Sequence, residues 1–110
     1  MKSIYRLKKN YQYNYVYKHA QSVADRNLVL LYCKSNNKQS KVGFSVNKKF
    51  GNAVRRNRIR RQMKAAVSQF MPDVSIGYNM IFIPRKNEDY LFSDIIQSVN
   101  ALLTRSGLLK

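Results

Sequence analysis

The spacing of apolar residues along the chain predicts three helices. The first begins after an N-cap at Asn10 and ends near residue 20, and the second spans residues 52–70 before Pro72 stops it. The third begins at an N-cap at Ser93 and ends at a C-cap at Gly107. The apolar series are Tyr13, Val16, Tyr17 and Ala20; Ile59, Met63, Ala66, Val67 and Phe70; and Ile95, Ile96, Val99, Leu102 and Leu103. Each series places one apolar stripe on its helix.

Between these helices the apolar residues lose helical spacing and predict strands. Residues 26–34 and 41–46 are expected to form two antiparallel strands joined by the polar loop SNNKQS, with a further short strand at residues 21–25. Residues 78–84 are apolar in succession, which indicates a buried strand at an interior position of a sheet. The order helix, strands, helix, strand, helix predicts an α/β domain with a strand–helix–strand crossover.

The chain carries far more positive than negative charge. Its 110 residues suit one domain, residues 1–110, and 21 Lys and Arg against five acids give a formal net charge of +16. No acid lies between Asp25 and Asp73, an interval with twelve basic residues. Such a surface attracts polyanions, with nucleic acid favoured over an anionic membrane. No apolar run reaches the roughly 20 residues of a membrane span and the N-terminus lacks a signal-peptide pattern, so we expect a soluble, cytoplasmic protein.

Residue types that carry protein-based catalysis are nearly absent. Cys33 is the only cysteine and His19 the only histidine, so neither a disulfide nor a Cys/His metal cluster is expected. The chain also lacks a glycine-rich phosphate loop and a nucleophile elbow. We therefore expect no catalytic residue and no metal ligand. If the protein serves an enzyme, the reactive groups belong to another molecule.

The second predicted helix concentrates basic residues away from its apolar stripe. Asn57, Arg58, Arg61 and Lys64 project opposite the stripe, Arg60 lies on its flank, and Arg55 and Arg56 fall in the first turn. Cations at this end oppose the helix dipole, yet guanidinium groups beside unpaired backbone N–H groups suit phosphate. A solvated face kept for solubility is the alternative, but such a face normally mixes charges of both signs. The pattern favours nucleic-acid binding.

Tyrosines cluster at the N-terminus. Five of the eight lie in the first 17 residues, among basic side chains: Tyr5, Tyr11, Tyr13, Tyr15 and Tyr17. Aromatic rings beside cations stack on unpaired bases, each worth about 1–3 kcal/mol, which favours single-stranded RNA. Because Tyr13 and Tyr17 share the apolar face of their helix, packing against the sheet is an equal alternative for these two.

Several segments resemble the protein component of bacterial ribonuclease P. The most specific is GNAVRRNRIRR, residues 51–61, which resembles the arginine–asparagine–arginine signature of that family at Arg56, Asn57 and Arg58. The segments YRLKKNYQYNYVYKHAQSVADRN, VGFSVNKKFGNAV and IFIPRK resemble other parts of the family pattern in the same order. The resemblance extends along almost the whole chain.

The resemblance implies a fold, a partner and a reaction. The fold is an α/β (α+β) two-layer sandwich whose central βαβ crossover is left-handed, against the usual rule. One protein binds one catalytic RNA subunit, and a cleft between the first helix and the sheet receives the single-stranded 5′ leader of precursor tRNA. The RNA subunit, which binds the Mg2+, carries the endonucleolytic hydrolysis that removes the leader. The implied RNA-subunit-binding residues are Lys48, Lys49, Asn52, Arg55, Arg56, Asn57, Arg58, Arg60, Arg61 and Lys64, and the leader-binding residues are Lys9, Tyr13, Tyr17 and Arg85.

The chain departs from the family pattern at three positions. Leu31 stands where many relatives have a cleft tyrosine, and Tyr32 is expected to point to the opposite face. Pro84 is expected to end its strand and shift Arg85, and Ala20 replaces the usual glycine before the first strand. A ribosomal protein of similar fold would also explain the charge, but not the aromatic first helix. A DNA-reading helix-turn-helix requires two consecutive helices, which the predicted order does not offer.

Overall fold

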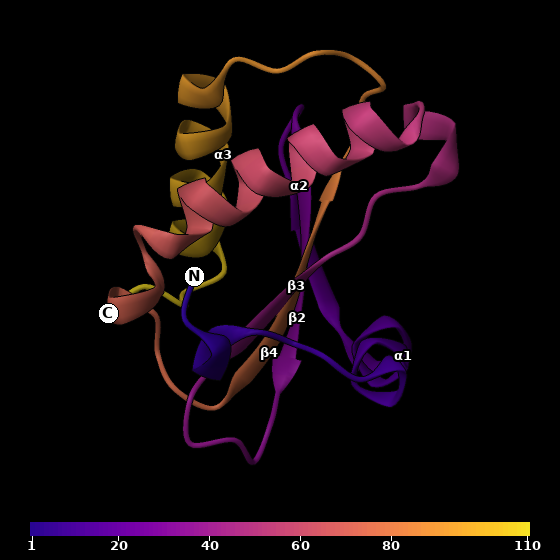
Figure 1. Ribbon diagram of the computed structural model, residues 1–110. Coiled ribbons are helices and arrows are strands. Elements are labelled where there is room, and N and C mark those ends of the chain that lie inside the picture. The colour runs from indigo at the N-terminus through magenta and orange to yellow at the C-terminus, as the bar shows by residue number, and fades with distance from the viewer.

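The computed structural model describes all 110 residues, and a four-stranded sheet forms its centre (Figure 1). The strands are β1 (Gln21–Ala24), β2 (Leu28–Lys34), β3 (Lys41–Phe44) and β4 (Tyr78–Pro84), in the spatial order β1-β2-β4-β3. β4 pairs antiparallel with β2 and parallel with β3. The parallel pair is joined through a helix, so the predicted strand–helix–strand crossover is confirmed.

Three helices cover the sheet: α1 (Asn10–His19), α2 (Ala53–Ser68) and α3 (Phe92–Arg105). Short 3-10 turns occupy Ser3–Tyr5, Lys48–Phe50 and Met71–Asp73. α2 and α3 lie together on one side of the strands, and α1 lies alone on the other (Figure 1). The expected α/β sandwich is confirmed, and its main layers are the sheet and the α2–α3 pair. None of the helices has both the length and the apolar character needed to cross a bilayer.

The pairing of the two strands around the loop SNNKQS differs from the expectation. β2 and β3 run in opposite directions, but β4 lies between them and takes the hydrogen bonds of both. The reason lies in β4, where four consecutive residues, 79–82, are buried. A strand buried on both faces is most stable at the centre of the sheet. The interior position predicted for residues 78–84 is therefore confirmed, and it makes β3 an edge strand.

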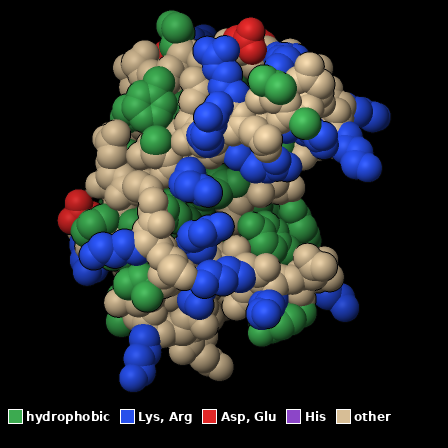
Figure 2. Space-filling view, viewed as in Figure 1, with side chains coloured by type: hydrophobic (Ala, Val, Ile, Leu, Met, Phe, Trp, Pro, Cys, Tyr) green, Lys and Arg blue, Asp and Glu red, His purple; other side chains and the backbone are tan.

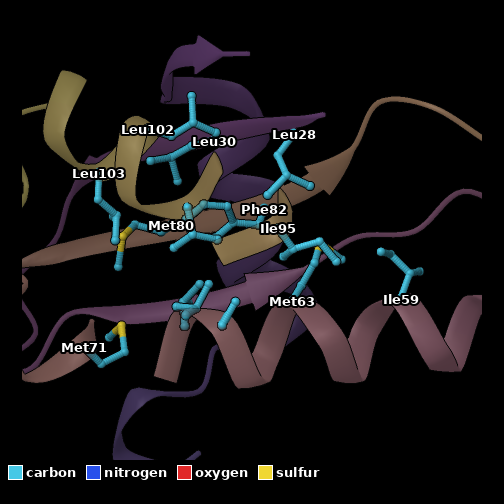
Figure 3. Packing of buried hydrophobic residues seen from close by; sticks show 14 of the residues in the cluster. Leu28, Leu30, Ile59, Met63, Met71, Met80, Phe82, Ile95, Leu102 and Leu103 are labelled. Atoms are coloured by element: carbon cyan, nitrogen blue, oxygen red, sulfur yellow. The ribbon is translucent and has the colours of Figure 1, made fainter. Parts of the chain in front are cut away.

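Two apolar clusters of unequal size hold the layers together. The larger cluster fills the space between the sheet and the α2–α3 pair, where Met63 and Ile95 pack near Phe82 (Figure 3). The predicted stripes of both helices point into it: Ile59, Met63, Ala66 and Val67 from α2, and Ile95, Val99, Leu102 and Leu103 from α3. The smaller cluster has only Leu7, Val16 and Ile81 as its buried members. α1 therefore buries little of its surface and leaves most of its tyrosines accessible.

The helix ends agree with the expectations in part. Asn52 is the N-cap of α2, since its Oδ1 accepts a hydrogen bond from the Arg55 amide at 3.0 Å. Gly107 follows the C-cap Ser106 and has a φ of +77°, which glycine adopts without the steric cost of a side chain.

The caps predicted at Asn10 and Ser93 are wrong by one and two residues. Asn10 is the first residue of α1, because the Gln12 side chain accepts a hydrogen bond from the Lys9 amide at 3.0 Å and so satisfies this end of the helix. α3 begins at Phe92, and Leu91 occupies the cap position without a capping side chain.

Candidate nucleic-acid interface

The outward face of α2 carries cations without carboxylate partners. Asn57, Arg58 and Arg61 are exposed, and Arg60 and Lys64 are half-buried on the side nearer α1. The one ion pair of the structure joins Arg55 to Asp89 at 3.5 Å. Figure 2 shows Lys and Arg side chains in a column across this side of the molecule, with acidic groups only at its edges. A surface of this kind holds polyanions through many weak phosphate contacts.

Two residues of the predicted RNA-binding set are engaged within the fold. Arg55 donates hydrogen bonds to the Phe50 carbonyl at 3.0 Å and to the Asn87 side chain at 2.9 Å, and its guanidinium lies 5.1 Å from the Phe50 ring centroid. The Asn52 side chain is occupied as the cap of α2. The preceding Lys48 and Lys49, in contrast, are exposed. The structure therefore assigns Arg55 and Asn52 to the support of the basic helix.

The arginine–asparagine–arginine segment orients a neighbouring guanidinium. Arg60 donates a hydrogen bond to the Asn57 side chain at 3.1 Å, one helical turn away. The Nε atom of Arg56 is the only buried side-chain nitrogen or oxygen without a hydrogen-bond partner. Asn57 thus restricts where the Arg60 guanidinium lies, and Arg56 retains an unused donor.

A groove separates α1 from α2 beside the outer edge of β3, and it consists of two adjoining hollows. The wider one, of about 450 Å³, is lined by Asn10, Tyr13, Asn14, Tyr17, Phe44, Ser45, Val46 and Arg60. The smaller one, of about 220 Å³, is lined by Arg6, Leu7, Tyr13, Val42, Gly43, Phe44, Arg60 and Lys64. We call the two together the α1–α2 groove. In Figure 2 the surface is hollowed between these helices, with hydrophobic side chains in the hollow and cations around it.

The two groove tyrosines differ in how they are held. Tyr17 is 49% exposed and open to a ligand. Tyr13 is half-buried, with its ring over Gly43, where a Cβ would lie only 2.7 Å from the ring atom Cε1. Burial raises the pKa of Tyr13, although the Phe44 backbone opposes the shift. Tyr13 packs on the sheet, as the packing alternative expected, and it also lines the groove, while its contact with RNA stays a prediction.

The structure does not bring the other predicted leader residues into this groove. Lys9 is exposed just before α1 and lines neither hollow. Arg85 follows the end of β4 at Pro84 and donates a hydrogen bond to the Asp25 carbonyl at 2.7 Å. Leu31 contacts the small cluster under α1, whereas Tyr32 packs against the larger cluster on the opposite face, as expected.

Three residues of the groove are not among the predicted site residues: Arg6, Asn14 and Phe44. Arg6 is one of several basic residues among the N-terminal tyrosines, Phe44 lies in a predicted strand, and Asn14 has no distinctive feature in the sequence. Their convergence depends on the N-terminal segment, because the Leu7 amide donates a hydrogen bond to the Val42 carbonyl at 3.0 Å and sets this segment along the edge of β3.

Side chains suited to metal binding are sparse. The structure contains no group of three or more His, Cys, Asp or Glu side chains that could hold a metal ion. Burial raises the pKa of the Cys33 thiol, which lies among the residues packed under α1. The surface thus offers cations, aromatic rings and amides, which suit RNA binding.

Comparison with known proteins identifies the family. The Ribonuclease P family profile matches residues 1–107. The chain is 37% identical to the ribonuclease P protein component of Oceanobacillus iheyensis over 100% of its own length and 93% of the relative, and 38% identical to that of Clostridioides difficile over 93% and 91%.

Solved structures of similar fold carry the same name. A Staphylococcus aureus RNase P protein, a mutant with defective mRNA degradation activity, superposes with a TM-score of 0.85 at 31% identity, covering 96% of this chain and 90% of that one. The RNase P protein of Thermotoga maritima superposes with a TM-score of 0.81 at 27% identity, covering 91% and 96%. With the order of its elements, its basic helix and its aromatic first helix, the chain belongs to the ribonuclease P protein component family.

Proposed function

We propose that this chain, as the protein component of the endoribonuclease ribonuclease P, binds the catalytic RNA subunit and the 5′ leader of precursor tRNA. The supporting observation is that α2, a basic helix without an acidic residue, adjoins an aromatic groove, with Arg60 common to both. The protein neutralises phosphate charge on the RNA and increases the affinity for precursor tRNA, and the RNA subunit catalyses the reaction. One protein binds one RNA subunit in the cytoplasm.

The RNA-subunit contact uses the exposed cations of α2 and of the turn before it. These are Lys48, Lys49, Arg58 and Arg61, together with the half-buried Arg56. Arg55 and Asn52 act indirectly by holding the start of α2, since their side chains are already engaged. Planar guanidinium groups suit bidentate contacts with phosphate oxygens, which explains a surface in which arginine outnumbers lysine.

The leader contact uses the α1–α2 groove. An unpaired strand presents bases that stack on an accessible ring and phosphates that pair with cations. Tyr17 supplies the accessible ring, Arg60 the cation, and Asn14 an amide that can meet a base edge. Lys9 and Arg85 lie outside the hollows, so we propose that they contact more distant parts of the leader.

The reaction is hydrolysis of the phosphodiester bond between the leader and the mature tRNA, for which bound Mg2+ would supply charge stabilisation. The residues of this chain do not fit a Mg2+ site of their own, because no carboxylate cluster is present. We therefore propose that the RNA subunit binds the metal ions. The protein holds the leader on one side of the scissile bond and lowers phosphate repulsion between the two RNA molecules.

Reconstituted cleavage tests this function. The protein is added to a bacterial ribonuclease P RNA and precursor tRNA at low Mg2+, where the RNA alone is slow because phosphate repulsion is least screened. We expect a large gain in leader cleavage, and we expect Arg58→Ala combined with Arg61→Ala to reduce it. An equal rate with and without the protein contradicts the proposal.

A further inference from the structure

The smaller hollow of the α1–α2 groove brings three cations to one tyrosine hydroxyl. Arg60 and Lys64 reach it from α2, and Arg6 reaches it from the segment that lies along β3. Tyr13 lines the same hollow, and both Arg6 and Arg60 act electrostatically on its hydroxyl. No acidic residue lines the hollow. Three cations with no anion beside them repel one another, so the binding of a negatively charged group in the hollow is favourable.

The hydroxyl end of the Tyr13 ring lies against the sheet. A Cβ at residue 43 would overlap the hydroxyl oxygen and two ring atoms, so this end of the ring lies directly on the backbone of Gly43. A tyrosine hydroxyl is protonated at neutral pH, and burial raises the pKa of Tyr13 further, so the hydroxyl is available as a hydrogen-bond donor.

The position of Arg60 is fixed from outside the hollow. Its Nη1 donates to the side chain of Asn57, while the guanidinium also lines both parts of the groove. A cation held in this way loses less side-chain entropy when it binds a ligand.

We propose that Tyr13, Arg6, Arg60 and Lys64 form a pocket for one phosphate group of the RNA strand that lies in the α1–α2 groove. This inference rests on the proposed function and deepens it. The strand is the leader, because the pocket shares Tyr13, Phe44 and Arg60 with the wider hollow where Tyr17 stacks on a base. Tyr13 then acts as a phosphate donor and Tyr17 as the stacking residue, so the two tyrosines have different functions.

Removal of the single hydroxyl tests the pocket in the holoenzyme. Tyr13→Phe keeps the ring over Gly43, so the variant should fold, and it should weaken precursor tRNA binding roughly ten- to a hundredfold through one lost bond to a charged group. The affinity for mature tRNA and for the ribonuclease P RNA should not change. The matched control is Tyr15→Phe, which removes a hydroxyl from an exposed ring outside the groove.

A modified leader locates the phosphate. Leaders with one neutral methylphosphonate are tested at each linkage in turn. With the wild-type protein one linkage should cause a distinct loss of affinity, and with Tyr13→Phe or Arg6→Gln that loss should be much smaller. The charge control for Arg6→Gln is Arg26→Gln, in the turn between β1 and β2, which should retain the wild-type pattern.

The outcomes separate this inference from the proposed function. If Tyr17→Ala weakens precursor binding while Tyr13→Phe binds as wild type, the leader contact stands and the phosphate pocket is refuted. If Tyr13→Phe instead weakens binding of the ribonuclease P RNA, the phosphate belongs to that RNA and the assignment to the leader is wrong. If neither tyrosine matters, the proposed leader contact fails as well.

Discussion

Two arginines three positions apart in α2 should respond in opposite ways to truncation. Arg55 is bound within the protein, whereas Arg58 is exposed and forms no ion pair. We therefore expect Arg55→Ala to reduce protein stability with little direct effect on RNA affinity. We expect Arg58→Ala to reduce RNA affinity with little effect on stability.

The magnitude for Arg55 follows from its contacts. Two hydrogen bonds, at 3.0 and 2.9 Å, and the Phe50 ring at 5.1 Å are lost together. The ion pair adds little, because Asp89 is 72% exposed. Water can replace part of each hydrogen bond, so the free energy of unfolding should fall by about 1–2 kcal/mol. For a domain of this size that lowers Tm by roughly 4–8 °C for each kcal/mol.

Two assays separate these effects. Thermal melts followed by far-UV circular dichroism measure stability, where Arg58→Ala should stay within about 0.5 kcal/mol of wild type. Salt titration of ribonuclease P RNA binding measures phosphate contacts, where the slope of log K against log salt should fall by about 0.7–0.9 for Arg58→Ala. Arg55→Ala should keep the wild-type slope. A reduced slope for Arg55→Ala together with an unchanged Tm would refute the division between supporting and binding arginines.

Three further changes test particular contacts. Gly43→Ala should reduce the free energy of unfolding by about 1–3 kcal/mol through the clash with Tyr13, and much less in a Tyr13→Ala background, as measured by denaturant unfolding. Leu30→Ala removes a fully buried side chain from the main core and should cost about 2–5 kcal/mol in the same assay; a smaller loss would mean that the core is looser than described. Burial alone would raise the pKa of Asp25, but hydrogen bonds from Ser98 and from nearby backbone amides outweigh it, so the pKa lies below 3.8. The carboxylate therefore stabilises the fold above that pH, and the stability gap between wild type and Asp25→Asn should close as the pH falls through the folded-state pKa; a constant gap down to acid pH would contradict this.

Much of the fold could be predicted because burial determines the periodicity of apolar residues. The stripe of α2 and the uninterrupted apolar run of β4 both appear in the structure as expected. The position of β4 between β2 and β3 could not be predicted from the loop that joins those two strands. Strand order depends on long-range contacts, and a polar loop of six residues permits either arrangement.

The part of the candidate site whose residues are close together in the sequence could be predicted. The part that consists of residues distant in the sequence could not, because folding brings them together. The basic residues of α2 formed one local pattern. The approach of Arg6 to Tyr13 depends on how the N-terminal segment lies along β3, and the internal contacts of Arg55 depend on Asn87, which is 32 residues away. A local sequence pattern identifies which residues can bind RNA, but the residues that they contact in space follow only from the tertiary structure.

The central claim is that the α1–α2 groove holds the leader of precursor tRNA. The most direct measurement is the ratio of the affinities of the reconstituted holoenzyme for precursor and mature tRNA, with the wild-type protein and with Tyr17→Ala. Loss of one stacked base is worth about 1–3 kcal/mol, so Tyr17→Ala should lower the ratio roughly tenfold while the affinity for mature tRNA stays constant. An unchanged ratio, or an equal loss for both RNAs, would contradict the claim.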